Sequence, residues 1–249
     1  MSSASSSLTI AKLLTDAAKR KASDIHLVAG SPPTVRVDGA LVELADQPPV
    51  TKESVEAVLA ELADAPTRQR LEAQRSVRFV VLYEDRLRLR VNAFYTRGAL
   101  AMTLKLIASG VPTLAELGLA GAFGGLATLT QGLVIVSGPY NAGRTTTVAA
   151  ILEEINRTQT RGVMTIESPI EYLYQNKQSL FQQREVGRDA LGFLEALRYS
   201  QEADVDVLYV GEHDEAGTVP LLLEIAAAGR LVFTVMDSVT AVQTVERIF

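Results

Sequence analysis

After residue 131, apolar runs alternate with segments of helical spacing. Residues 133–136 form an apolar run of the kind that lies buried on both faces of a parallel sheet. A turn-rich loop follows, and then helical spacing over residues 145–156. Further strand-like runs, with room for helices between them, cover residues 163–166, 206–210 and 231–235. This alternation predicts an α/β unit whose mostly parallel sheet is covered by helices.

The residues before this unit follow another pattern. Apolar spacing predicts one helix over residues 8–21, and Thr51 opens a second that reaches residue 63. Strand-like runs cover residues 25–28, 34–37, 41–44, 77–83 and 86–95. We therefore expect a disordered tail over residues 1–7, one domain over 8–97, a linker over 98–114 and a second domain over 115–249.

One of these strand-like runs carries alternating arginines. Arg86, Arg88 and Arg90 are separated by single aliphatic residues. Since successive side chains of a strand point to opposite faces, the three arginines are expected on one face. A solvated sheet face is the ordinary interpretation, and binding of an anion is the alternative.

Composition excludes several classes of function. The net charge of −5 gives no basic field for nucleic acid, so we expect no nucleic-acid partner. Cysteine is absent, which excludes disulfides, and His26 and His213 are the only histidines, which argues against a multi-histidine metal site.

Targeting signals are also missing from the sequence. The first seven residues lack the basic and apolar regions of a signal peptide. No apolar run approaches the roughly 20 residues that span a bilayer. We expect a cytoplasmic chain that reaches a membrane through partners and does not insert into it.

A phosphate-binding pattern lies between the first buried run and its helix. Gly138, Gly143 and Thr145 have the spacing of the loop G-x-x-x-x-G-K-[ST], in the required strand–loop–helix context. In such a loop, backbone N–H groups and the helix N-terminus hold phosphate oxygens, and the hydroxyl holds magnesium. The candidate phosphate-binding residues are Gly138, Asn141, Ala142, Gly143, Arg144, Thr145 and Thr146. The alternative is an ordinary strand–turn–helix without a ligand.

Arg144 stands where this pattern has lysine. The positive charge is kept, but a planar guanidinium replaces a compact ammonium group. We expect phosphate attraction to persist and catalytic positioning to suffer, because a misplacement of about 1 Å can cost about 100-fold in rate. Asn141 stands where related loops have glycine, and asparagine tolerates positive φ better than most residues.

Five further segments are distributed along nearly the whole chain: ASDIHL from Ala22, RVNAF from Arg90, TIESPIEY from Thr165, QREVGRD from Gln183 and DVLYVGE from Asp206. In this order they resemble segments of the PilT-type family of secretion ATPases, which retract type IV pili. Such a co-linear set is more specific than any single motif. The resemblance implies a PAS-like N-terminal domain and a RecA-like ATPase core, and thus an α/β fold.

The resemblance also implies how such a protein works. Its members bind ATP with Mg²⁺ at the subunit boundaries of a hexameric ring and act on a platform protein of the inner membrane. Glu212 matches the Walker B acid, which would share the metal with Thr145, and Glu167 matches a catalytic acid. Arginines that match phosphate-reaching positions are Arg88, Arg90 and Arg97, with Arg198 in the core.

The sequence departs from the family at several of these positions. Besides Arg144, Ser168 replaces an acid, and Glu202 stands where an arginine is usual. The two histidines of a conserved box are replaced by Arg230 and Asp237. The chain stops at Phe249, before the helical C-terminal region of the family, so it is either a fragment or has lost that region.

Three functions remain open from the sequence. The first is an ATP-binding subunit of a retraction motor in which hydrolysis is impaired. The second is a non-hydrolysing regulatory subunit that assembles with an active paralogue. The third, a nucleic-acid motor with the same core, is disfavoured by the acidic charge. Pilus extension and secretion ATPases share much of the pattern.

Overall fold

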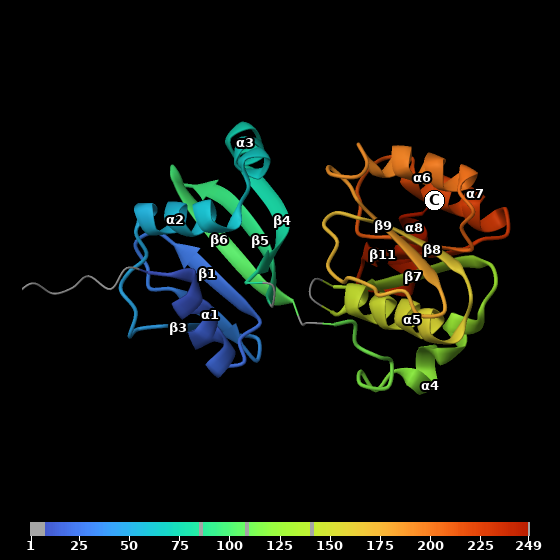
Figure 1. Cartoon of the computed structure of the whole chain (residues 1–249), viewed down its shortest axis with the longest axis horizontal. Coiled ribbons are helices and arrows are strands. Elements are labelled where there is room, and N and C mark those ends of the chain that lie inside the picture. The colour runs from blue at the N-terminus through green and yellow to red at the C-terminus, as the bar shows by residue number, and fades with distance from the viewer. Residues whose placement is uncertain (1–7, 85–86, 108–109, 140–141, 249) are drawn as a thin grey trace, which may run out of the picture. The chain divides into compact units, whose positions relative to one another are not determined.

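The structure is a computed structural model that describes residues 8–84, 87–107, 110–139 and 142–248. The chain divides into two compact units, Met1–Ser109 and Gly110–Phe249 (Figure 1). The tail expected over residues 1–7 lies outside the described residues. Within the described part of the chain, every helix is too short or too polar to cross a bilayer.

The first unit is built on a six-stranded antiparallel sheet in the order β3-β2-β1-β6-β5-β4. Its strands are β1 (Asp24–Val28), β2 (Thr34–Val37), β3 (Ala40–Glu43), β4 (Ser76–Tyr83), β5 (Leu87–Thr96) and β6 (Ala99–Ile107). Its helices are α1 (Ile10–Lys19), α2 (Lys52–Leu62) and α3 (Ala65–Gln74).

The core of this unit follows from the two periodicities in the sequence. On β5, Leu89 and Val91 are fully buried, while Arg88 and Arg90 are only partly buried on the other face. Leu13 of α1 and Val55 of α2 join the same apolar cluster as the β5 residues. The predicted helices and paired strands are thus present, and Arg88 and Arg90 share a face as expected.

The expected linker over residues 98–114 is wrong for most of its length. Residues Ala99–Ile107 form β6, which pairs with both β1 and β5. Arg97 and Gly98, with φ of 49° and 74°, form the tight turn of the β5–β6 hairpin, in which Thr96 pairs with Ala99. A hairpin turn was therefore mistaken for the start of a connector.

The second unit is built on a five-stranded, fully parallel sheet in the order β7-β11-β10-β8-β9. Its strands are β7 (Gly132–Gly138), β8 (Gly162–Glu167), β9 (Leu180–Glu185), β10 (Val207–Val210) and β11 (Leu231–Asp237). Its helices are α4 (Ala120–Phe123), the 3₁₀ turn η1 (Gly124–Thr128), α5 (Arg144–Thr158), α6 (Phe193–Glu202), α7 (Thr218–Ala227) and α8 (Ala241–Glu246). The predicted α/β class with a mostly parallel sheet is confirmed.

Helices cover both faces of this sheet (Figure 1). Tyr209 of β10 packs in the cluster that includes Ile151 of α5. Its neighbour Leu208 packs in the opposite cluster, with Leu197 of α6 and Leu222 of α7. Burial on both faces explains why these strands are continuous apolar runs.

The parallel arrangement brings the carboxyl ends of the strands to one edge. Gly138 at the end of β7 is the register partner of Asp237 at the end of β11. Val210 at the end of β10 pairs with both Thr234 and Ile166. In open parallel sheets this edge is where ligands bind, so the loops that follow these strands are the candidate site.

Candidate functional site

The predicted phosphate loop joins β7 to α5. Gly143 has a φ of 83°, which glycine adopts without strain, and it immediately precedes the first residue of the helix. The Ala142 N–H donates to the Pro139 carbonyl over 3.1 Å, and the Thr147 N–H donates to the Gly143 carbonyl over 2.8 Å. The expected strand–loop–helix is therefore present, although the candidate Asn141 lies outside the described residues.

The loop folds back tightly on the end of its strand. A Cβ placed on Gly138 would lie 3.2 Å from the Ala142 Cβ and 3.7 Å from the Arg144 Cγ. Glycine at this position therefore allows the close approach of loop and strand. The first N–H groups of α5 have no partner within the helix, so this helix end favours an anion.

Arg144 turns inward from the first position of α5. Its side chain is 8% exposed, and Nη2 donates to Glu212 Oε1 over 3.4 Å. Its Nη1 is buried without a hydrogen-bond partner among the described residues. Leaving a buried charged donor unpaired costs about 1–3 kcal/mol or more, so this nitrogen is a strong candidate to donate to a ligand.

Glu212 follows β10 by two residues and its side chain is 55% exposed. Its ion pair with Arg144 crosses the edge of the sheet, because β11 lies between β7 and β10. The predicted acid and the predicted phosphate loop are therefore brought together. Sequence reasoning did not find that the two side chains bind each other.

The threonines of the loop lie beside tyrosines. The pKa of Tyr209 on β10 is raised well above its usual value by burial, an effect that the nearby Thr145 side chain opposes. Thr146 Oγ1 and the Tyr172 hydroxyl lie 3.1 Å apart and share a hydrogen bond. The hydroxyl expected to hold magnesium therefore has a buried tyrosine as its neighbour.

Glu167 closes β8 as a buried carboxyl group. It is 4% exposed, and the Thr165 hydroxyl donates to its Oε1 over 2.7 Å. Burial raises its pKa to about 7, an effect to which the nearby Glu171 charge adds and which the Thr165 hydrogen bond opposes. A carboxyl group with this pKa can accept or release a proton near neutral pH.

Glu167 also lies next to the chain that leads to Glu212. A Cβ placed on Gly211 would lie 3.4 Å from the Glu167 Cα, and the Gly211 N–H donates to the Ile166 carbonyl over 2.9 Å. The two predicted catalytic acids therefore stand on neighbouring strands, one buried and one exposed.

The remaining predicted arginines stand on elements other than these loops. Arg88, Arg90 and Arg97 belong to the first unit, where Arg97 is exposed in the β5–β6 turn. Arg198 is exposed on α6 of the second unit.

The departures from the family pattern do not gather at one place. Arg230 stands just before β11, at the edge of the sheet away from the loop, and donates to the carbonyls of Gln201, Ala203 and Val205 over 2.8–3.3 Å. Asp237, at the other end of β11, is exposed. Ser168 and Glu202 are also exposed. Of the departures in the second unit, Arg144 is the one that is buried at the loop.

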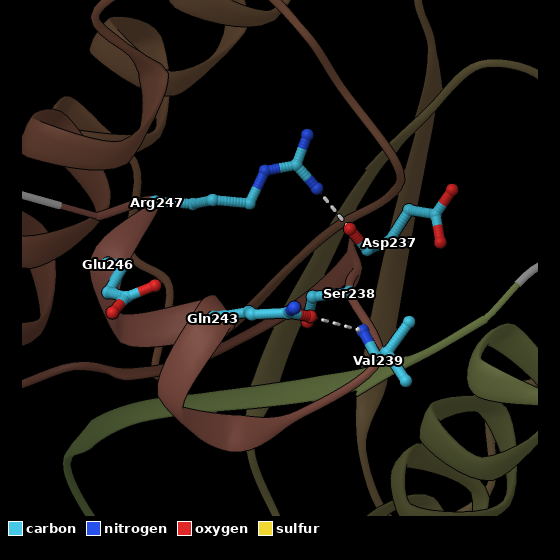
Figure 2. Close-up of a pocket in the computed structure, with 6 residues that line it drawn as sticks. All are labelled: Asp237, Ser238, Val239, Gln243, Glu246 and Arg247. Atoms are coloured by element: carbon cyan, nitrogen blue, oxygen red, sulfur yellow. Dashed lines mark hydrogen bonds between the residues drawn. The ribbon is translucent and has the colours of Figure 1, made fainter.

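A hollow that sequence reasoning missed lies beyond the end of β11. It has a volume of about 380 Å³ and is lined by Asp237, Ser238, Val239, Gln243, Glu246 and Arg247. Figure 2 shows the Arg247 guanidinium donating to the Asp237 carbonyl, and the Val239 N–H donating to the Gln243 side chain. Apart from Asp237, these residues belong to none of the positions singled out in the sequence, and the paired ends of β11 and β7 place the hollow near the loop.

A magnesium ion fits these residues poorly. Of its expected ligands, Glu212 is paired with Arg144, and Thr145 lies beside Tyr209. In the described ranges no group of three or more histidine or acidic side chains is placed to hold a metal. A polyphosphate fits better, because the helix N-terminus and the unpaired Arg144 nitrogen both offer donors.

The parallel sheet and its glycine loop define a RecA-like core of the P-loop class, preceded by an antiparallel α/β domain. A sequence model of the family described as "Type II/IV secretion system protein" matches residues 2–249. The chain therefore belongs to this family of secretion ATPases.

Individual relatives agree with this assignment. The chain is 38% identical over 241 residues to the type IV pilus retractation ATPase PilT of Pseudomonas aeruginosa, covering 97% of this chain and 70% of that protein. It is 35% identical over 221 residues to a twitching motility protein of Neisseria gonorrhoeae, covering 89% and 59%.

Solved structures show the same fold. The crystal structure of the pilus retraction motor PilT with bound ADP matches with a TM-score of 0.85 and 37% identity, over 97% of this chain and 70% of that one. The Legionella pneumophila ATPase DotB matches with a TM-score of 0.81 at 24% identity, over 100% and 71%, which supports the fold alone.

Proposed function

We propose that the chain is an ATP-binding subunit of a type IV pilus retraction motor, the machinery of twitching motility. The observation that carries the proposal is the β7–α5 loop with the buried Arg144 behind it, in a chain whose relatives include PilT. The loop supplies backbone donors to the phosphates, and Arg144 supplies positive charge.

Hydrolysis is proposed to be impaired. Arginine cannot reproduce the point charge of the loop lysine, and the guanidinium occupies an oxygen of Glu212, the proposed Walker B acid. Glu167 keeps the pKa of a proton acceptor, but it is buried in the unliganded chain. ATP with Mg²⁺ is the expected ligand of the family. Here Thr145 and Glu212 would be the ligands of Mg²⁺, and Glu212 would first have to leave Arg144.

The assembly is proposed to be a hexamer of like subunits in the cytoplasm. Arg88, Arg90 and Arg97 of one subunit are proposed to approach the phosphates bound by a neighbour, and Arg198 those of its own subunit. The motor would act on a platform protein of the inner membrane, which the ring reaches through partner contacts and without inserting.

The second candidate function is a non-hydrolysing subunit that assembles with an active paralogue. The ion pair between Arg144 and Glu212 favours it, because the pair removes both side chains from their catalytic tasks while the fold is kept.

One pair of measurements on a single sample tests the proposal. A fluorescent ATP analogue is titrated into the protein, and phosphate release is followed in parallel. We expect wild type to bind saturably and to turn over slowly. Gly143→Val should lose binding, because the φ of 83° at this position is unfavourable for valine. Arg157→Ala, near the C-terminal end of α5 where Arg157 forms an ion pair with Glu154, is the matched control.

The outcomes separate the candidates. Binding without turnover, followed by turnover when an active paralogue is added, supports the regulatory subunit. Absence of nucleotide binding in wild type, with a folded protein, contradicts both candidates.

A further inference from the structure

The guanidinium of Arg144 stands where it can replace a metal ion. It begins at the first position of α5, passes the end of β7 at Gly138 and reaches Glu212 beyond β10. It therefore lies along the sheet edge between the phosphate loop and the proposed metal-binding acid. A divalent cation in a P-loop site has the same neighbours, since it bridges phosphate oxygens to the loop hydroxyl and the acid.

The charges at the edge are already balanced in part without a metal. Arg144 neutralises the Glu212 carboxylate, with Nη2 and Oε1 3.4 Å apart. The acidic member of the usual pair of metal ligands is thus held by a protein group. Glu167 is buried with a hydrogen bond from Thr165 and offers no second exposed carboxylate.

One nitrogen of Arg144 still needs an acceptor. The side chain is more than nine-tenths buried, and Nη1 has no hydrogen-bond partner in the described part of the chain. A guanidinium presents its N–H groups as a planar fork that matches phosphate oxygens. With Nη2 on Glu212, the unpartnered Nη1 is a donor available to a phosphate group held at the N-terminus of α5.

We infer that Arg144 takes the place of the divalent cation, so that this chain binds the polyphosphate of a nucleoside di- or triphosphate without a metal ion. The inference rests on the proposed nucleotide site and specifies its chemistry. The guanidinium links Glu212 to the phosphate, and the N–H groups of the α5 terminus supply the remaining donors. Only binding is involved, and no bond is made or broken.

The test compares nucleotide affinity with and without metal. A fluorescent ADP analogue is titrated into the whole chain in excess EDTA and again in excess Mg²⁺. We expect the two Kd values of wild type to agree within about threefold, which is under 1 kcal/mol. Mn²⁺ titrated with the same nucleotide, followed by electron paramagnetic resonance, should show no metal bound beyond that held by free nucleotide.

Two variants distinguish a metal-free nucleotide site from a metal-dependent one, because their effects on nucleotide affinity differ between the two. Arg144→Lys restores the compact ammonium and frees Glu212, so its binding should weaken by about tenfold or more in EDTA relative to Mg²⁺. Glu212→Gln removes the negative charge that competes for the guanidinium, so its binding in EDTA should tighten. If Glu212 held a metal, the same change would weaken binding in Mg²⁺.

A second arginine on the same helix supplies the control. Arg157→Lys should leave the ratio of the two Kd values unchanged, since Arg157 lies near the end of α5. Circular dichroism of each variant confirms that it is folded. Wild-type binding that weakens tenfold or more in EDTA overturns the inference and leaves the nucleotide site standing. Absence of binding in both conditions overturns the site itself.

Discussion

The Thr165 hydroxyl donates a hydrogen bond of 2.7 Å to Oε1 of Glu167, and both side chains are buried at the end of β8. The carboxyl group lies in the interior, and the groups that act on its pKa, Thr165, Glu171 and Gln183, include no cation. A neutral carboxylic acid is tolerated there far better than a carboxylate, because the interior solvates charge poorly.

Glu167 should therefore make stability fall as pH rises. Its folded pKa of about 7 lies above the ordinary value of 4.5, so between these values the folded state keeps a proton that the unfolded state has lost. The contribution of Glu167 to the free energy of unfolding is therefore greatest below pH 4.5 and declines as the pH rises to about 7. The total decline is about 3 kcal/mol at most. Glu167→Gln should remove this slope, as measured by urea unfolding of both proteins from pH 4.5 to 8. An equal slope in the variant would show that another group is responsible.

The Arg144–Glu212 pair should respond unequally to loss of its two members. Glu212→Ala leaves the Arg144 charge buried without a partner, so the unliganded protein should lose about 1 kcal/mol, a small value because Glu212 is half exposed. Arg144→Met removes the charge and fills the space, so thermal stability should stay equal or rise. Thermal unfolding without nucleotide compares the two, and a larger loss in Arg144→Met would contradict this account.

Gly162 should not tolerate even a methyl group. A Cβ at this first residue of β8 would lie 2.9 Å from the Asp204 carbonyl oxygen, which belongs to the backbone. Gly162→Ala should destabilise the protein by about 1–3 kcal/mol through displacement of that chain. Gly121→Ala is the matched control, because a Cβ there meets nothing within 4 Å. Since Gly121 is in α4, its replacement should raise stability slightly. Urea midpoints distinguish the two changes, and equal effects would refute the steric cause.

Arg230 should contribute to stability and not to nucleotide binding. Its guanidinium holds three carbonyls between the end of α6 and the start of β10. Arg230→Ala should cost about 1–2 kcal/mol, because these acceptors lose a charged donor. It is separated from the phosphate loop by the length of β11, about 20 Å, so the nucleotide Kd should remain within about twofold. A titration beside the urea curve checks both, and a large loss of affinity would place Arg230 at the site.

The parts of the fold with a strong local signal could be predicted from the sequence. The run before Gly138, the positive-φ glycine at Gly143 and the following helix are specified within one short segment. β6 could not be assigned, because Arg97 and Gly98 resemble the start of a connector until the pairing with β1 and β5 is known. β9 was missed for a similar reason, since Leu180–Glu185 is largely polar and lies at an edge of the sheet.

The sequence predicted several residues of the candidate site but not the contacts between them. Motif and resemblance identified Arg144 and Glu212 separately. Their ion pair joins residues 68 positions apart, and it depends on the order of the strands in the sheet. Arg230 is the opposite case. The sequence groups it with the departures at the nucleotide site, but the structure places it at the edge of the sheet away from the phosphate loop.

β7 lies at one edge of the core sheet, and in the described part of the chain it is paired with β11 alone. Its residues before Gly138 are uncharged and all partly exposed. A strand of this kind is a template onto which another strand can add, and charged residues that would discourage such addition are absent from it. The phosphate loop therefore follows a strand whose other edge is not paired with a strand in the described part of the chain. Self-association through the unpaired edge of β7 would restrain the loop. Nucleotide affinity should therefore be measured across a range of protein concentrations.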